Sequence, residues 1–154
     1  MKAVIGVLLA LFKTIFKKDE GSVVVEKELE PVMGVLGPVV YEILNRVMAG
    51  MGDSEAAIYL PDNLMKAYNK QEVMDSNHLI EVSAITYVTE VMDCDDFAAK
   101  LYGRFAGLVW TNKHALNWFI DEAGTFWWID AKAKKLSQTL EGWQGTDIRF
   151  FLAR

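Results

Sequence analysis

The residues Cys94, His114 and Asp130 have the side chains that thiol-dependent acyl transfer requires. Such chemistry uses a thiolate as the nucleophile, a base that takes the thiol proton and an acid that orients the base. A structural interpretation of the same residues is simpler. A lone cysteine is usually a small buried hydrophobe, and both His114 and Asp130 could be ordinary strand residues. Residue types alone therefore leave a Cys–His–Asp site and three structural residues as open alternatives.

Three carboxylates flank the thiol, at Asp93, Asp95 and Asp96. Nearby anions disfavour a thiolate, so these residues need a role of their own. They could turn outward and cap the start of a helix, which is the commoner arrangement for an acidic helix start. They could instead bind a hard divalent cation, whose charge would favour the thiolate. In a third interpretation the thiol never ionises and the domain serves only for binding.

The apolar residues after the cysteine predict the helix that would carry it. Phe97, Leu101 and Phe105 recur at a spacing of four residues, and Gly107 is expected to end the helix. Cys94 would then lie at the helix N-terminus, where the helix dipole favours a thiolate.

Two alternating, aromatic-rich runs at residues 114–120 and 125–130 predict a β-hairpin. Asp121 and Gly124 in the connection indicate a type I turn closed by a glycine bulge, with Asp121 opposite Thr125. We expect the preceding helix to pack its apolar stripe on the hairpin face that carries the histidine and the aspartate. In the predicted register six side chains share that face: His114, Leu116, Trp118, Phe126, Trp128 and Asp130.

Apolar periodicity predicts further elements. A second short helix, with a weaker signal, is expected to begin at a cap residue, Asp62 or Asn63. Residues 81–92 fit a strand and a helix equally and stay unassigned, whereas residues 148–152 alternate as a further strand. A longer helix with one buried face is expected from Pro38 to the glycines at 50 and 52, because apolar residues recur there at helical spacing: Val39, Val40, Ile43, Leu44, Val47 and Met48.

The N-terminal residues differ from the rest of the chain. Residues 3–12 are apolar or small and are flanked by lysines, but a helix needs about 20 such residues to span a bilayer. No small-x-small cleavage site follows, and lysines suit anionic headgroups. We favour a helix at residues 1–18 that contacts a membrane surface or a protein partner, over a core helix or an atypical signal. Residues 19–22 are then a linker, and residues 23–154 form a single domain.

Composition excludes several classes of protein. Hydrophobic residues make up 52% of the 154, enough to build a core and to exclude general disorder. The net charge of −5 repels a phosphate backbone, so we expect no nucleic-acid partner. A single cysteine cannot form an internal disulfide, and with two histidines it cannot form a cysteine-rich zinc site.

The residues around the thiol resemble a known family. The similar runs are Asp-Cys-Asp-Asp-Phe-Ala at 93–98, His-Ala-Leu-Asn-Trp-Phe-Ile-Asp at 114–121 and Trp-Trp-Ile-Asp at 127–130. They resemble the papain-like cysteine protease domain of the fairy-ring mushroom agglutinin family, including its bacterial and phage relatives. The resemblance covers residues 81–154, about half of the chain. The Cys–His–Asp order is more distantly similar to transglutaminase-like and other papain-like enzymes.

The resemblance implies a role for each candidate residue. Cys94 would be the nucleophile, His114 the base and Asp130 the orienting acid, where the agglutinin has Glu. The agglutinin domain's activity depends on calcium, so the resemblance also implies a calcium site at the three carboxylates that flank the thiol.

Together these arguments predict an α+β, papain-like domain. N-terminal helices would precede a small antiparallel sheet, and the nucleophile would lie at a helix N-terminus. The predicted function is hydrolysis of a peptide or related amide by a Cys94–His114–Asp130 triad, and a membrane-bound amidase acting on cell-wall peptide would use the same triad. The alternative is a catalytically inactive structural or binding module, associated with a virion or an envelope. The sequence does not determine the localisation, and association with a membrane or with a virion are the candidates.

Overall fold

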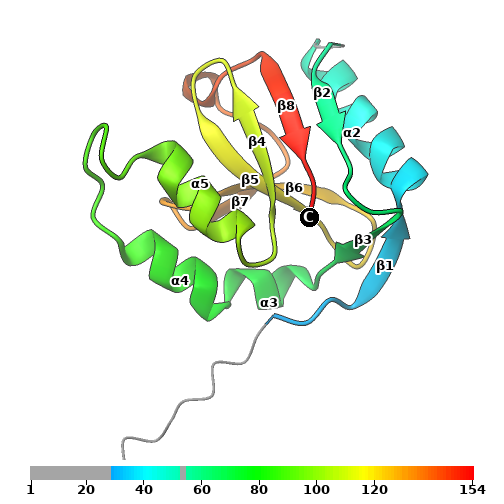
Figure 1. Ribbon diagram of the computed structural model, residues 1–154, viewed down its shortest axis with the longest axis horizontal. Helices are drawn as coiled ribbons and strands as arrows, with labels where there is room; N and C mark the ends of the chain where they lie inside the picture. Colours follow the sequence, from blue (N-terminus) through cyan, green and yellow to red (C-terminus); the bar gives the residue numbers. More distant parts are fainter. Residues whose placement is uncertain (1–28, 53–54) are drawn as a thin grey trace, which may run out of the picture.

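The computed structural model describes residues 29–52 and 55–154 (Figure 1). The predictions for the helix at residues 1–18 and the linker at residues 19–22 lie outside the described residues. None of the helices in the described ranges is long and apolar enough to cross a membrane.

A six-stranded sheet organises the fold, in the order β2-β8-β4-β5-β6-β7 (Figure 1). Neighbouring strands are antiparallel except for the parallel pair β2–β8. The sheet is therefore larger than the small antiparallel one expected, and it includes a parallel pair. Its strands are β2 (Ala57–Tyr59), β4 (Gly107–Thr111), β5 (Ala115–Ile120), β6 (Phe126–Asp130), β7 (Lys135–Ser137) and β8 (Ile148–Leu152).

A second sheet and the helices surround these strands, which makes the fold a mixed α/β one. β1 (Met33–Leu36) pairs with β3 (Leu64–Ala67) in a two-stranded antiparallel sheet. These strands come before most of the helices, so the helices do not simply precede the sheet as expected. The helices are α2 (Gly37–Met51), α3 (Lys70–Met74), α4 (Asn77–Ala84), α5 (Cys94–Tyr102) and the short 3-10 helix η1 (Gly142–Gln144).

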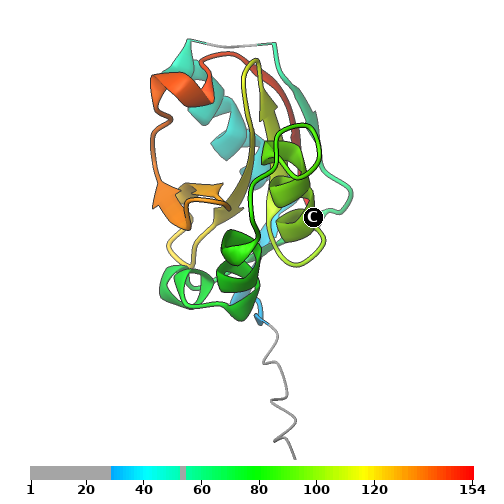
Figure 2. The same cartoon turned by 90° about the vertical axis from the view of Figure 1, so that its left-hand side faces the viewer.

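The two faces of the β5–β6 hairpin pack against different helices, and Figure 2 shows strands of the large sheet between α2 and α5. Leu116, Trp118 and Trp128 belong to the core cluster that contains the buried face of α2. Phe119 and Ile129 belong to the second cluster, with the apolar stripe of α5. The expectation that α5 packs on the face of Leu116 and Trp128 was wrong. Both faces of the hairpin are apolar, so the sequence pattern could not choose between them.

The predicted register of the hairpin is confirmed. β5 pairs with β6 through Trp118 opposite Trp128, so Asp121 lies opposite Thr125. Asp121 N donates to Thr125 O at 2.9 Å, and Gly124 N donates to Asp121 O at 3.0 Å. Gly124 has a φ of 78°, the left-handed conformation that the predicted bulge requires.

The helix after Pro38 is confirmed as α2, and Gly52 caps it with a φ of 77°. The strand at residues 148–152 is confirmed as β8. The short helix expected after Asn63 is wrong, because those residues form β3, where Met65 and Ala67 are buried with the period of two that is typical of a strand.

The helix that carries Cys94 is shorter than expected. α5 ends at Tyr102, and Gly103 caps it. Phe105 lies beyond the helix although it is buried in the same cluster. Gly107 does not end a helix; it begins β4, a strand that the sequence analysis did not predict. The unassigned segment divides between the last residues of α4 and a loop in which Glu90 has a φ of 59°.

Replacing Gly107 with alanine is expected to destabilise the domain by about 1–3 kcal/mol, the usual cost of overpacking a core. The added Cβ would lie inside van der Waals contact with the indole of Trp118, which is buried and donates to Leu108 O at 3.2 Å. Gly50→Ala is the control, because its Cβ would meet nothing within 4 Å. Urea denaturation measures both variants, and equal stabilities would contradict this packing.

Candidate functional site

Cys94 is the first residue of α5 and is partly buried. Asp96 folds back on the helix start, where its carboxylate accepts a hydrogen bond from Asp93 N at 3.2 Å. The helix is fixed to the sheet by Asn117 of β5, whose Nδ2 donates to Ala98 O at 2.9 Å and to Gly107 O at 3.0 Å. The sulfur is therefore carried by a helix end that is tied to a buried strand.

His114 lies in the turn between β4 and β5, and Thr111 holds that turn. Thr111 N donates to His114 O at 2.9 Å, and the Thr111 hydroxyl accepts from His114 N at 2.9 Å. The same hydroxyl lies 2.6 Å from Gln144 O, to which it donates. The side chain of His114 is 18% exposed, and its ring centroid lies 5.1 Å from that of Trp143.

Asp130 ends β6 and is buried. Its Oδ1 accepts a hydrogen bond from Ala133 N at 2.9 Å, and its Oδ2 accepts one from Gln144 Nε2 at 3.4 Å. The distance from His114 Nε2 to Asp130 Oδ2 is 3.9 Å. The two groups are neighbours but are not hydrogen-bonded at this distance.

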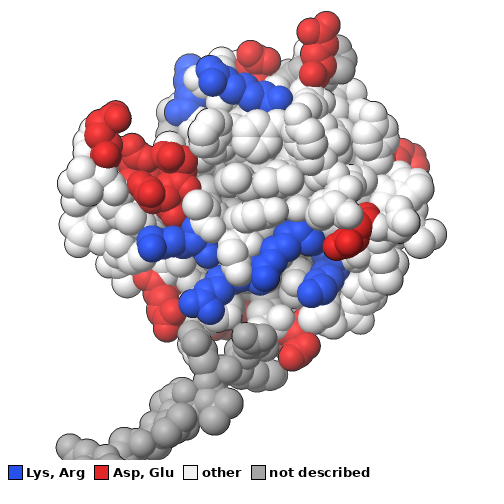
Figure 3. All heavy atoms as spheres, viewed as in Figure 1, with Lys and Arg blue, Asp and Glu red and all other residues white. Residues whose placement is uncertain are grey.

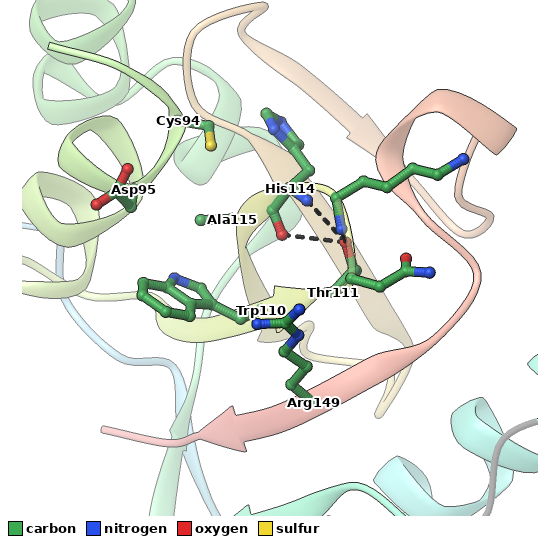
Figure 4. Close-up of a pocket in the computed structure, with 9 residues that line it drawn as sticks. Cys94, Asp95, Trp110, Thr111, His114, Ala115 and Arg149 are labelled. Carbon is green, nitrogen blue, oxygen red and sulfur yellow. Dashed lines mark hydrogen bonds between the residues drawn. The ribbon is translucent and has the colours of Figure 1, made fainter. Parts of the chain in front are cut away.

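Cys94 and His114 line one pocket of about 260 Å³, together with Trp110, Ala115 and Arg149. Figure 4 shows the sulfur and the imidazole ring facing the same space. The structure thus brings the cysteine and the histidine together, with Asp130 beside the histidine ring.

The position of His114 explains how α5 can reach it from the other face of the hairpin. The last β4–β5 pair joins Trp110 to Ala115, so His114 lies just beyond the paired strands. Its side chain is therefore not restricted to one face of the sheet. The small side chain of Ala115 lies in the same pocket and leaves room between sulfur and ring.

Burial lowers the pKa of His114, and the nearby charge of Asp130 opposes this effect without cancelling it. The imidazole is therefore neutral at neutral pH. A neutral ring can accept a proton from a thiol, as a general base must.

Two of the three predicted metal ligands suit a cation. The carboxylates of Asp93 and Asp95 and the sulfur of Cys94 lie within 4.8 Å of one another. A hydrogen bond between these two carboxyl groups lowers the pKa of Asp93 and raises that of Asp95. A divalent cation could replace the proton of this bond, although two carboxylates supply only part of the six to eight oxygens that calcium takes. Asp96 acts instead as a helix cap, as the capping interpretation expected.

Several residues of the site were missed in the sequence. Thr111 and Gln144 position the histidine and the aspartate, and Arg149 lines the pocket. Asn117, which ties α5 to the sheet, could have been found in the sequence, because it is a polar residue in an otherwise apolar strand. Its Oδ1 is buried without a partner in the described part of the chain.

The solved structures that are similar to this chain include two lectin chains. A Polyporus squamosus lectin, bound to the human-type influenza-binding epitope Neu5Aca2-6Galb1-4GlcNAc, has a TM-score of 0.62 and 19% identity over 78% of this chain. PSL1a in complex with E64 has a TM-score of 0.62 and 20% identity, also over 78% of this chain. This chain spans 49% and 51% of their respective lengths. No protein-family model matches the sequence, and no curated protein is detectably similar to it.

These likenesses confirm the coarser part of the predicted resemblance, a distant link in fold to fungal agglutinin-like lectins. At such identities they show the fold alone. The papain-like assignment and the roles of Cys94, His114 and Asp130 remain predictions.

The burial of His114 should make stability depend on pH. Because its pKa is lowered in the folded state, the unfolded chain takes up the proton first as pH falls below about 6.5. The free energy of unfolding should therefore fall more steeply between about pH 7.5 and about pH 5.5 in the wild type than in His114→Gln. Urea denaturation at both pH values measures the difference, and parallel losses would show that the ring is not buried in its neutral form.

Proposed function

We propose that the chain is a cysteine-dependent acyl-transfer enzyme that hydrolyses a peptide or a related amide. The observation that carries this proposal is the shared pocket of Cys94 and His114, two residues that come from different elements. Asp130, 3.9 Å from the ring, is the third member. The sulfur at a helix N-terminus and the neutral imidazole both suit the chemistry.

The arrangement assigns a step to each residue. His114 Nδ1 takes the thiol proton of Cys94, since Nε2 is the ring nitrogen nearer Asp130. The thiolate attacks the amide carbon, and the amine leaves with the proton that His114 returns to it. Water, deprotonated by His114, then hydrolyses the thioester and frees the thiol. Asp130 orients the ring and stabilises its charged form.

A divalent cation would be held by Asp93 and Asp95 in this proposal. Bound there, it would supply positive charge that favours the thiolate and offsets the two carboxylates. The remaining oxygen ligands would come from water or substrate.

The lectin likenesses favour a second function, a non-catalytic module that binds carbohydrate. They support this alternative better than they support hydrolysis, because one of the two structures holds a glycan. A pocket of about 410 Å³ between α2 and the segment before β8 could serve it. Gln138 and Thr146 line this pocket, and within the described ranges their side chains make no hydrogen bond. Free amide and hydroxyl groups at the edge of a pocket suit a saccharide.

Alkylation of Cys94 tests the enzyme proposal, and mass spectrometry is unambiguous because the chain has one cysteine. We expect iodoacetamide to react below pH 7, and His114→Ala to slow the reaction there by about tenfold or more, because the base is lost. A chelator should slow it too if a cation offsets Asp93 and Asp95. His78→Gln, which changes the other histidine, is the control. E64 is a second probe of Cys94, because the similar chain PSL1a forms a complex with it.

Each result of this experiment has a distinct meaning. If the chelator does not change the alkylation rate but His114→Ala does, the cation proposal is wrong and the Cys–His pair stands. Indifference to both the chelator and His114→Ala would mean that Cys94 is inert, which contradicts the enzyme proposal and leaves the binding module.

Glycan binding tests the second function. A saccharide found on a glycan array should bind Cys94→Ala as tightly as wild type, since this module needs no thiol. Gln138→Ala and Thr146→Ala should each weaken binding by about fivefold to tenfold in calorimetry, the usual cost of a lost hydrogen bond. Gln71→Ala, an exposed amide on α3, is the control. Absence of glycan binding, or binding unchanged in both variants, would contradict the assignment.

A further inference from the structure

The thiol pocket has opposite charges on its two sides. Asp95 at the start of α5 lines one side, and Lys113 and Arg149 line the other. In Figure 3 acidic side chains gather over the start of α5, and basic side chains gather over the β4–β5 turn and the start of β8. The division places positive charge across the pocket from the acidic pair Asp93 and Asp95.

Arg149 lies at an irregularity of the sheet that directs its side chain. Trp110 pairs with Phe150 and Thr111 pairs with Ile148, so the register of β4 and β8 shifts and Arg149 has no partner across the strands. Such bulges change the direction of a side chain and are frequent beside functional sites. Here the bulged residue is one that lines the pocket (Figure 4).

The guanidinium of Arg149 is available to a ligand. Within residues 29–52 and 55–154 it has no carboxylate within salt-bridge distance and no hydrogen bond, although the chain carries a net charge of −5. The ammonium of Lys113 makes a long contact of 3.4 Å with Gly142 O. Arginine offers a planar fork of donors that matches a carboxylate.

Trp110 adds an apolar wall next to this arginine. Trp110 is 38% exposed, and its ring packs against Phe150 with ring centroids 5.6 Å apart. A partly exposed indole beside an unpaired guanidinium can hold the carbon chain of a ligand whose carboxylate meets the arginine.

We infer that Arg149, Lys113 and Trp110 form a subsite for a carboxylate, so that the enzyme selects substrates with an acidic group next to the scissile amide. This inference rests on the proposed function and names its substrate class. Where no cation offsets it, the acidic pair repels the carboxylate from the other side, so a substrate binds in one orientation. The bond to be cleaved then lies over Cys94, between the two charged sides.

A pair of alkylating reagents that differ in charge tests the subsite without a known substrate. Iodoacetate carries a carboxylate and iodoacetamide is its neutral counterpart, so the ratio of their rates at Cys94 measures the preference for an anion. We expect Arg149→Gln to lower the iodoacetate to iodoacetamide ratio by about two- to fivefold, and Arg149→Glu to lower it further. Lys113→Gln should act in the same direction and more weakly. Arg104→Gln, an exposed arginine outside the pocket, should leave the ratio unchanged.

A titration provides a second measurement that does not depend on thiol reactivity. N-acetylglutamate α-amide carries a side-chain carboxylate, N-acetylglutamine carries a terminal one, and N-acetylglutamine amide is the neutral control. We expect one or both acids to shift the indole N–H signal of Trp110 in NMR spectra, and the neutral amide not to do so. The acid that binds identifies the source of the carboxylate. Arg149→Gln should abolish the shift.

The results separate this inference from the proposed function. If iodoacetamide reacts in a His114-dependent way but Arg149→Gln changes neither the rate ratio nor the titration, the subsite is wrong and the enzyme proposal stands. If Cys94 is inert while the titration depends on Arg149, the enzyme proposal is wrong and the carboxylate site stands. Equal binding of the neutral amide and the acids would overturn the subsite in either case.

Discussion

The carboxylate of Asp121 fixes the alignment of β5 and β6, and the candidate site depends on that alignment. Its Oδ1 accepts hydrogen bonds from Ala123 N at 2.9 Å and Thr125 N at 2.8 Å, and its Oδ2 accepts one from Trp127 Nε1 at 2.7 Å. Burial opposes the ionisation of Asp121, but these hydrogen bonds outweigh it and lower its pKa. A slip of one residue would reverse the face of every side chain in β6 and move Asp130 away from His114.

Burial on both faces makes the hairpin a rigid support. All residues of β5 are buried. Leu116 and Trp118 belong to the core cluster that contains the buried face of α2, and Phe119 belongs to the cluster that contains the apolar stripe of α5. Neither helix alone could cover these aromatic residues. The candidate site lies where the hairpin ends, because only there can a residue such as His114 meet the start of α5. A site at the end of a doubly covered sheet combines a fixed frame with access for a ligand.

The register of the hairpin was predictable from the sequence, whereas the packing of α5 and the position of Arg149 were not. The turn at Asp121 and Gly124 follows from residues that are adjacent in the chain, so the register could be derived. The side of the hairpin that α5 covers depends on packing between two apolar faces, which periodicity cannot rank. The role of Arg149 could not be predicted for a similar reason, because its bulge exists only through pairing with β4. The sequence did not predict β4 either, because its first residue, Gly107, was interpreted as the end of a helix.

The segment at residues 138–146 connects the two pockets on which the candidate functions depend. It lines the larger pocket with Gln138 and Thr146. It also reaches the thiol site through Gln144, whose Nε2 donates to Asp130 and whose carbonyl accepts from Thr111. A ligand in the larger pocket would therefore contact the same segment that positions the acid and the histidine turn. The two functions are alternatives for the chemistry of Cys94, but in this fold their pockets share one structural element.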